Sequence, residues 1–159
     1  MSDRIKEIVA RESVRTLEKL AFIFAMPEEE ELEPKEGETI DVAVSFNGPF
    51  SGSMMILYPS TDLTELTANM LGLDDEDEIS GEHKLDALKE AINIICGNIL
   101  PAVGGNAAVF DIDAPVAIED PGSRPDVSAA VKVQLALDEG VCFLYLLFDG
   151  EMPDVGPGQ

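Results

Sequence analysis

An amphipathic pattern from Leu85 to Gly105 constrains the fold of this chain most, because it predicts a long helix with two different faces. Apolar residues recur every three or four positions along one side: Leu85, Leu88, Ile92, Ile95, Cys96, Ile99 and Val103. On the opposite side, four residues fall within an arc of about 60°. These four residues, here called the polar face, are Asp86, Glu90, Asn93 and Gly97. A helix that buries its apolar side therefore presents a carboxylate and a carboxamide that are three residues apart, close enough to hold one small target.

Two residues in this pattern affect the shape of the predicted helix. Pro101 lacks the N–H group that would bond to the carbonyl of Gly97, so we expect a kink or an early end there. Gly97 has no side chain, so another backbone could come close to the helix beside Glu90 and Asn93. Gly97 could equally permit packing of the helix inside this protein, and the residues alone leave both interpretations open.

Five segments have the residue pattern of β-strands. They are Thr39 to Asn47, Gly52 to Tyr58, Ala107 to Ala114, Ala129 to Leu137 and Val141 to Phe148. The first alternates apolar and polar residues, which is typical of a strand covered on one side. The last, VCFLYLLF, is apolar at all eight positions, so we expect it to be central, covered on both faces, or part of a subunit contact.

Two further helices are predicted from residues with helical spacing. The first runs from residue 3 to about 25, and a gap in its apolar spacing predicts a bend or a frayed segment at residues 9–14. The second extends from about Ser60 to Gly72, with a capping hydroxyl at its start and a glycine stop. We expect residues 1–150 to form a single domain and the Pro/Gly-rich residues 151–159 to be disordered.

The chain is strongly acidic. Its 32 Asp and Glu residues exceed its 10 Lys and Arg residues, which gives a formal net charge of -22 in 159 residues. This charge opposes binding to nucleic acid and to anionic membranes, so we expect neither as a partner. The N-terminus lacks the apolar core of a signal peptide, and no apolar run reaches the length of a membrane span. We therefore expect a cytoplasmic protein.

Residues that usually support thiol, metal or histidine chemistry are few. Cys96 and Cys142 lack metal-ligand spacing, and we expect each to be a small buried apolar residue. The one histidine, His83, stands among charged residues near the start of the predicted long helix, and we expect it to be solvated. The sequence therefore predicts no metal site and no cofactor of the chain's own.

The polar face also carries a resemblance to a known family. Its motif is Asp86-x3-Glu90-x2-Asn93, then Gly97-Asn98, then Pro115. This motif resembles that of the CheC/CheX/FliY phosphatases of bacterial chemotaxis. The single copy of the motif and the chain length are most similar to CheX, and the resemblance extends from about Glu12 to Asp149. One residue fewer separates Asn93 from Pro115 than in the family pattern.

The resemblance implies an α+β fold in which two long helices pack on a mixed β-sheet of about five or six strands. A faint internal repeat agrees with a pseudo-two-fold arrangement, because Leu17-Glu18-x2-Ala21 parallels Lys89-Glu90-x2-Asn93. The hairpin of residues 42–58 likewise parallels that of residues 131–148. Ala21 stands where the other half has Asn93, so we expect one site, and CheX-like proteins suggest a homodimer.

The resemblance further implies a phosphatase that acts on a phosphorylated CheY-type response regulator. Asn93 would hold the attacking water in line with the phosphoaspartate, because a carboxamide donates and accepts hydrogen bonds at once. Glu90 would bind the active-site lysine of the regulator, and the Mg²⁺ would belong to the regulator. The residues expected along the contact with this partner are Asp86, Gly97, Asn98 and Pro115.

Two other functions are compatible with the residues. The fold could serve as a noncatalytic adaptor in a flagellar switch or signalling complex, with the apolar segment from Val141 to Phe148 as its interaction surface. A hydrolase that uses Asp86 and Glu90 as a carboxylate pair has less support, because nothing in the sequence supplies an evident substrate pocket or a reason for split pKa values.

Overall fold

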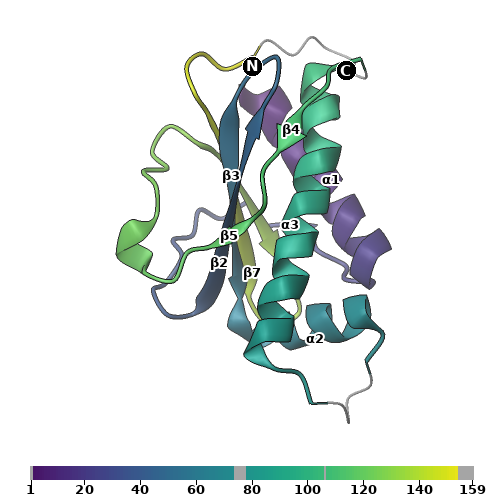
Figure 1. The fold of residues 1–159 in the computed structure, drawn as a ribbon. Helices are drawn as coiled ribbons and strands as arrows, with labels where there is room; N and C mark the ends of the chain where they lie inside the picture. The colour runs from purple at the N-terminus through teal and green to yellow at the C-terminus, as the bar shows by residue number, and fades with distance from the viewer. Residues whose placement is uncertain (1, 74–77, 106, 154–159) are drawn as a thin grey trace.

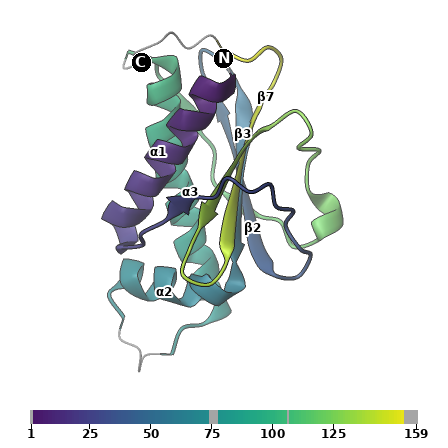
Figure 2. The ribbon, with the colours of Figure 1, turned by 180° about the vertical axis from the view of Figure 1, so that it is seen from behind.

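The computed structural model describes residues 2–73, 78–105 and 107–153, and it contains a seven-stranded sheet with the two long helices on one face (Figures 1 and 2). The helices are α1 (Ser2–Ala21), α2 (Ser60–Leu71) and α3 (Gly81–Gly104), with a short 3₁₀ helix η1 (Pro121–Ser123). The strands are β1 (Met26–Pro27), β2 (Thr39–Asn47), β3 (Gly52–Pro59), β4 (Asp111–Ile112), β5 (Val116–Ala117), β6 (Val131–Ala136) and β7 (Val141–Phe148). The strand order is β1-β6-β7-β3-β2-β4, and β5 also pairs with β2.

Strand β7 lies at the centre of the sheet, between β3 and β6. Three of its buried side chains, Cys142, Leu144 and Leu146, belong to the core under the helices. Phe143 and Tyr145 belong to a second core, which loop residues cover on the other face. The continuous apolar pattern is therefore explained by a central strand covered on both faces. Because β7 is buried, it offers neither the adaptor surface nor the subunit contact considered above, and the homodimer stays a prediction.

The sheet differs from the expected one in two details. Each described strand pair is antiparallel, so the sheet is not mixed. It has seven strands within the described ranges rather than five or six. Three of them, β1, β4 and β5, contain only two residues each. Strands this short produce no periodic pattern in the sequence. The strand expected from Ala107 to Ala114 is also shorter in the structure, where it is reduced to the two residues of β4.

Helix α1 is continuous through residues 9–14, where the sequence suggested a bend. The fully buried Ser13 occupies the inward position at which the apolar pattern is interrupted. The helix ends at Ala21, four residues earlier than expected, because Phe22 adopts a left-handed backbone conformation with φ of 55°. Residues 22–25 then lead into β1 instead of completing another helical turn.

Helix α3 begins at Gly81 and continues beyond Pro101 to Gly104, so the proline does not end it. The hydroxyl of Ser80 caps its first turn by accepting a hydrogen bond from the backbone N–H of the exposed His83 at 3.1 Å. Its apolar side is buried in the core: Leu88, Ile92, Ile95, Cys96, Ile99 and Val103. None of the described helices is both long and apolar enough to cross a membrane.

The two halves of the fold are arranged in the same way. Helix α1 packs against β6 and helix α3 packs against β2, while the hairpins β6–β7 and β2–β3 meet along the β3–β7 pair. This arrangement agrees with the predicted pseudo-two-fold repeat. Ala21 is fully buried, so α1 has no exposed counterpart of Asn93.

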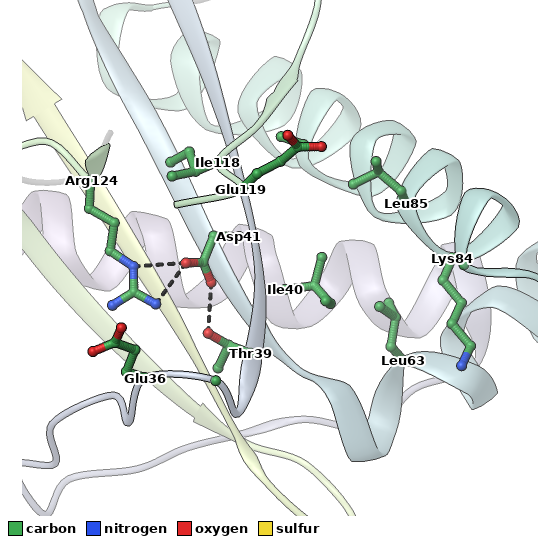
Figure 3. Close-up of a pocket in the computed structure, with 13 residues that line it drawn as sticks. Glu36, Thr39, Ile40, Asp41, Leu63, Lys84, Leu85, Ile118, Glu119 and Arg124 are labelled. Atoms are coloured by element: carbon green, nitrogen blue, oxygen red, sulfur yellow. Dashed lines mark hydrogen bonds and ion pairs between the residues drawn. The ribbon is translucent and has the colours of Figure 1, made fainter. Parts of the chain in front are cut away.

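A part-buried ion pair fastens the loop after β5 to strand β2 (Figure 3). The Arg124 Nε and Nη2 atoms each lie 2.7 Å from Oδ2 of Asp41, and the Thr39 hydroxyl donates to Oδ1 at 2.7 Å. Only 4% of the Asp41 side chain is exposed. The neighbouring N–H of Ile118 donates to the Asp41 carbonyl. These contacts hold β5 in place beside β2, where it also contacts α3.

The Gly52→Ala substitution is expected to destabilise the centre of the sheet. A Cβ atom at Gly52 would lie 2.0 Å from the backbone carbonyl oxygen of Leu147 in the partner strand β7, so the strands would have to separate. We expect a loss of about 3 kcal/mol in the free energy of unfolding, measured by urea denaturation. Gly81→Ala is the control, because a Cβ at Gly81 meets no described residue within 4 Å. Equal unfolding midpoints for the two variants would contradict this prediction.

The Arg124→Met substitution is expected to leave the buried Asp41 carboxylate without its cation, at a cost of about 3 kcal/mol in stability. Adding Asp41→Asn removes the unpaired charge, so the double variant should be more stable than Arg124→Met alone. Urea denaturation of both variants and of wild type measures the effect. A double variant that is no more stable than Arg124→Met would show that the unpaired charge is not the cause.

Candidate functional site

The polar face of α3 is directed to solvent. Asp86, Glu90 and Asn93 are exposed, whereas the apolar side of the same helix is buried against the sheet. Within the described part of the chain, the side chains of Glu90 and Asn93 form no hydrogen bond or ion pair with another residue. Both groups are therefore free to contact a molecule that approaches the outer side of α3.

The structure distinguishes between the two interpretations of Gly97. Apart from the backbone of its own helix, a Cβ atom at this position would have, among the described residues, only Cδ1 of Ile112 within 4 Å, at an ordinary contact distance of 3.9 Å. Packing inside this chain therefore does not require glycine at position 97. The absence of a side chain leaves a shallow surface beside Glu90 and Asn93, which favours the close approach of another molecule.

The side chain of Asn98 is directed toward α1 rather than toward the polar face. Its Nδ2 donates to the Thr16 hydroxyl at 2.9 Å, and that hydroxyl donates to the Glu12 carbonyl oxygen at 2.7 Å. Asn98 therefore fastens the two long helices together. Its contact with a partner stays a prediction, while its amide already has this internal function. Thr16 was not identified from the sequence, because it is 82 residues from Asn98 and has no motif of its own.

Pro115 lies between β4 and β5, in a segment that runs along α3 (Figure 1). β4 and β5 both pair with β2 and both contact α3. Phe110, just before β4, packs edge-on against Phe50 with ring centroids 4.9 Å apart, which anchors this segment to the core. The half-buried Pro115 thus belongs to one wall beside the polar face, while its contact with a partner stays a prediction.

A cavity of about 590 Å³ lies near the start of α3, between that helix, β2 and the loop after β5 (Figure 3). Lys84 and Leu85 line it, together with the Asp41–Arg124 pair. Asp86 and Glu90 are not among its lining residues, so this cavity does not support the carboxylate-pair hydrolase. Among the described residues, no group of three or more His, Cys, Asp and Glu side chains is placed to hold a metal ion.

The cysteines behave as the apolar residues that the sequence predicts. Cys96 and Cys142 are both buried. Burial raises the pKa of the Cys96 thiol to about 12, and burial with the nearby Asp62 carboxylate raises the pKa of the Cys142 thiol further. Both groups therefore stay protonated at neutral pH and cannot act as thiolate nucleophiles.

The arrangement of the polar face limits its chemistry. A carboxamide can hold a water molecule but cannot attack or titrate, and the neighbouring carboxylate can bind a cation. Both lie on the outer surface of a helix rather than in an enclosed pocket. Chemistry at this face would therefore require a second molecule that covers the helix.

Comparison with known proteins agrees with this geometry. The family described as "Chemotaxis phosphatase CheX" matches residues 40–135, which is more than half of the chain and includes the whole polar face. A search of curated protein sequences found no match.

Several solved structures share the fold. CheX from Vibrio vulnificus superposes with a TM-score of 0.72 at 18% identity, covering 94% of this chain and 99% of that protein. CheX from Desulfovibrio desulfuricans has a TM-score of 0.69 at 17% identity, covering 92% and 99%. CheX from Borrelia burgdorferi, solved in a complex with CheY, BeF₃ and Mg²⁺, has a TM-score of 0.64 at 18% identity, covering 89% and 96%. The matched sequence family and the shared fold agree, and this chain belongs to the CheX family of chemotaxis phosphatases.

Proposed function

We propose that this chain hydrolyses the phosphoaspartate of a CheY-type response regulator. The observation that carries the proposal is the outward position of Glu90 and Asn93, which have no partner among the described residues and lie beside the open surface at Gly97. The complex of the Borrelia burgdorferi CheX with CheY, BeF₃ and Mg²⁺ supports a partner of this class. The Mg²⁺ belongs to the regulator in this proposal.

Asn93 positions the attacking water. Its carboxamide oxygen accepts a hydrogen bond from the water, and its NH₂ group can donate one, so the water is held in a single orientation. The water oxygen forms a bond to phosphorus while the bond between phosphorus and the aspartate oxygen breaks. The aspartate leaves as a carboxylate, and the water proton passes to the phosphate that is released. Positioning is sufficient here because an acyl phosphate is already reactive.

Glu90 binds the active-site lysine of the regulator. The carboxylate lies one helical turn before Asn93 on the same face, so an ion pair at Glu90 fixes the register of the carboxamide over the phosphoryl group. Asp86 extends the polar face by one further turn. In this division of roles, Asn93 acts on the reaction and Glu90 acts on binding.

Asn93→Ala and Glu90→Ala are expected to affect different kinetic constants. Loss of the carboxamide should lower kcat on the order of 10²-fold, because the water loses its alignment. Loss of the carboxylate should raise KM at least about tenfold, because the regulator's lysine loses its partner. The measurement is release of inorganic phosphate from phosphorylated response regulators.

Glu29→Ala is the control, because Glu29 is an exposed carboxylate in the loop after β1, at the opposite edge of the sheet from β4. It should resemble wild type in both constants. Equal changes in KM for Asn93→Ala and Glu90→Ala would contradict the division of roles. If wild type accelerates phosphate loss from no response regulator, while it still binds one, the chain is a noncatalytic docking module.

Gly97→Ala is expected to separate stability from activity. Alanine in a helix interior should raise the free energy of unfolding by about 0.5–1 kcal/mol, because it meets no close internal contact. The added methyl group should raise KM for the phosphorylated regulator by about tenfold, since it obstructs close approach to the helix. Urea denaturation and phosphate release measure the two effects. An unchanged KM would show that Gly97 is not part of the contact.

A further inference from the structure

The basic residues of this acidic chain are concentrated on one helix. Of ten Lys and Arg residues, five belong to α1, which has four acidic residues. These five are Arg4, Lys6, Arg11, Arg15 and Lys19. The remainder of the chain carries the excess of negative charge, so α1 is the element at which an anionic molecule would meet the least repulsion.

Two of these cations line a groove between α1 and α3, here called the α1–α3 groove. Its volume is about 460 Å³. The lining residues are Glu12, Arg15, Thr16, Lys19, Leu20, Ile94 and Asn98. Ile94 directly follows Asn93 and lies one turn beyond Glu90, so the groove is continuous with the polar face.

The exposed charged residues that line the groove are positive. Its one lining carboxylate, Glu12, is only 12% exposed and lies 3.1 Å from Arg11 Nε and 3.5 Å from Arg15 Nη1. The Arg15 side chain is 54% exposed. Lys19 is exposed and forms no ion pair with any of the residues described. Arg15 and Lys19 therefore present charge to solvent, while the negative charge of Glu12 is mostly covered.

We propose that the α1–α3 groove is a second docking surface, which binds the acidic surface of the response regulator beside its phosphorylated aspartate. The inference rests on the proposed function. A phosphoaspartate site carries the phosphoryl charge and the carboxylates that hold Mg²⁺, so its surroundings are anionic. Arg15 and Lys19 lie on the α1 side of the polar face, where such a surface would extend once Glu90 and Asn93 are covered.

The charges act mainly on the encounter between the proteins. The net charge of -22 repels an anionic partner at long range, but salt screens this repulsion beyond about 8–10 Å. Closer than about 8–10 Å, the exposed cations nearest to the partner attract it and influence the orientation in which it binds. Arg15 and Lys19 are thus expected to raise the association rate constant and to leave the chemical step unchanged.

Charge reversal with a matched control tests the inference. Arg15→Glu/Lys19→Glu makes the net charge more negative by four units, and Lys6→Glu/Lys35→Glu makes the same change at exposed residues outside the groove. Association with a CheY-type response regulator that wild type dephosphorylates, activated with beryllofluoride, is followed by stopped-flow at several salt concentrations. We expect the association rate constant to fall about tenfold or more in the groove variant and less than about twofold in the control.

The outcomes are distinguishable. A groove variant with a lower association rate constant, a weaker dependence on salt and an unchanged kcat supports the docking surface. Equal effects of the two charge reversals overturn it, as does a lower kcat with an unchanged association rate constant. Arg15→Gln/Lys19→Gln, which introduces no new carboxylate beside Glu12, should show a smaller loss in the same direction even if the reversal impairs folding. If Asn93→Ala retains full activity, the proposed function fails instead.

Discussion

Burial of the apolar side of α3 against β2 and β3 is the constraint that fixes the rest of this structure. Leu88, Ile92, Ile95 and Ile99 are fully buried, and each contributes roughly 1.5–3 kcal/mol. Rotation of the helix by one residue would expose part of this stripe and move Glu90 toward the core, where an unpaired carboxylate is costly. The same packing that stabilises the fold therefore directs Glu90 and Asn93 outward.

The proposed positioning of water also requires a rigid surface, because a displacement of about 1 Å can cost on the order of 10²-fold in rate. Helix α3 is supported on two sides. The Asn98–Thr16 hydrogen bond joins it to α1, and the segment from β4 to β5 lies along its other side. That segment is held in turn by the ring of Phe110 and by the Asp41–Arg124 ion pair. Residues outside the motif thus determine how accurately the motif is presented.

Local patterns in the sequence were sufficient for the long elements and for the polar face. The spacing of apolar residues predicts α3, and the alternation from Thr39 to Asn47 predicts β2 with its observed bounds. Contacts between distant residues carry no such pattern. Asn98 and Thr16 are 82 residues apart, and Arg124 and Asp41 are 83 apart, so neither pair could be inferred from spacing. The internal function of Asn98 was missed for this reason.

The net charge of the chain is an average property, and it differs from the charge at one part of the surface. A net charge of -22 opposes association with an extended anionic polymer, because many of its phosphates would be repelled by the negative charge spread over the protein surface. A folded partner with one anionic site meets only the charges within a screening length of about 8–10 Å. Among the residues that line the α1–α3 groove, the exposed charges are Arg15 and Lys19, while Glu12 is largely covered. An acidic protein can therefore repel nucleic acid and still, in the proposed function, bind a regulator whose phosphorylated carboxylate lies at the polar face of α3.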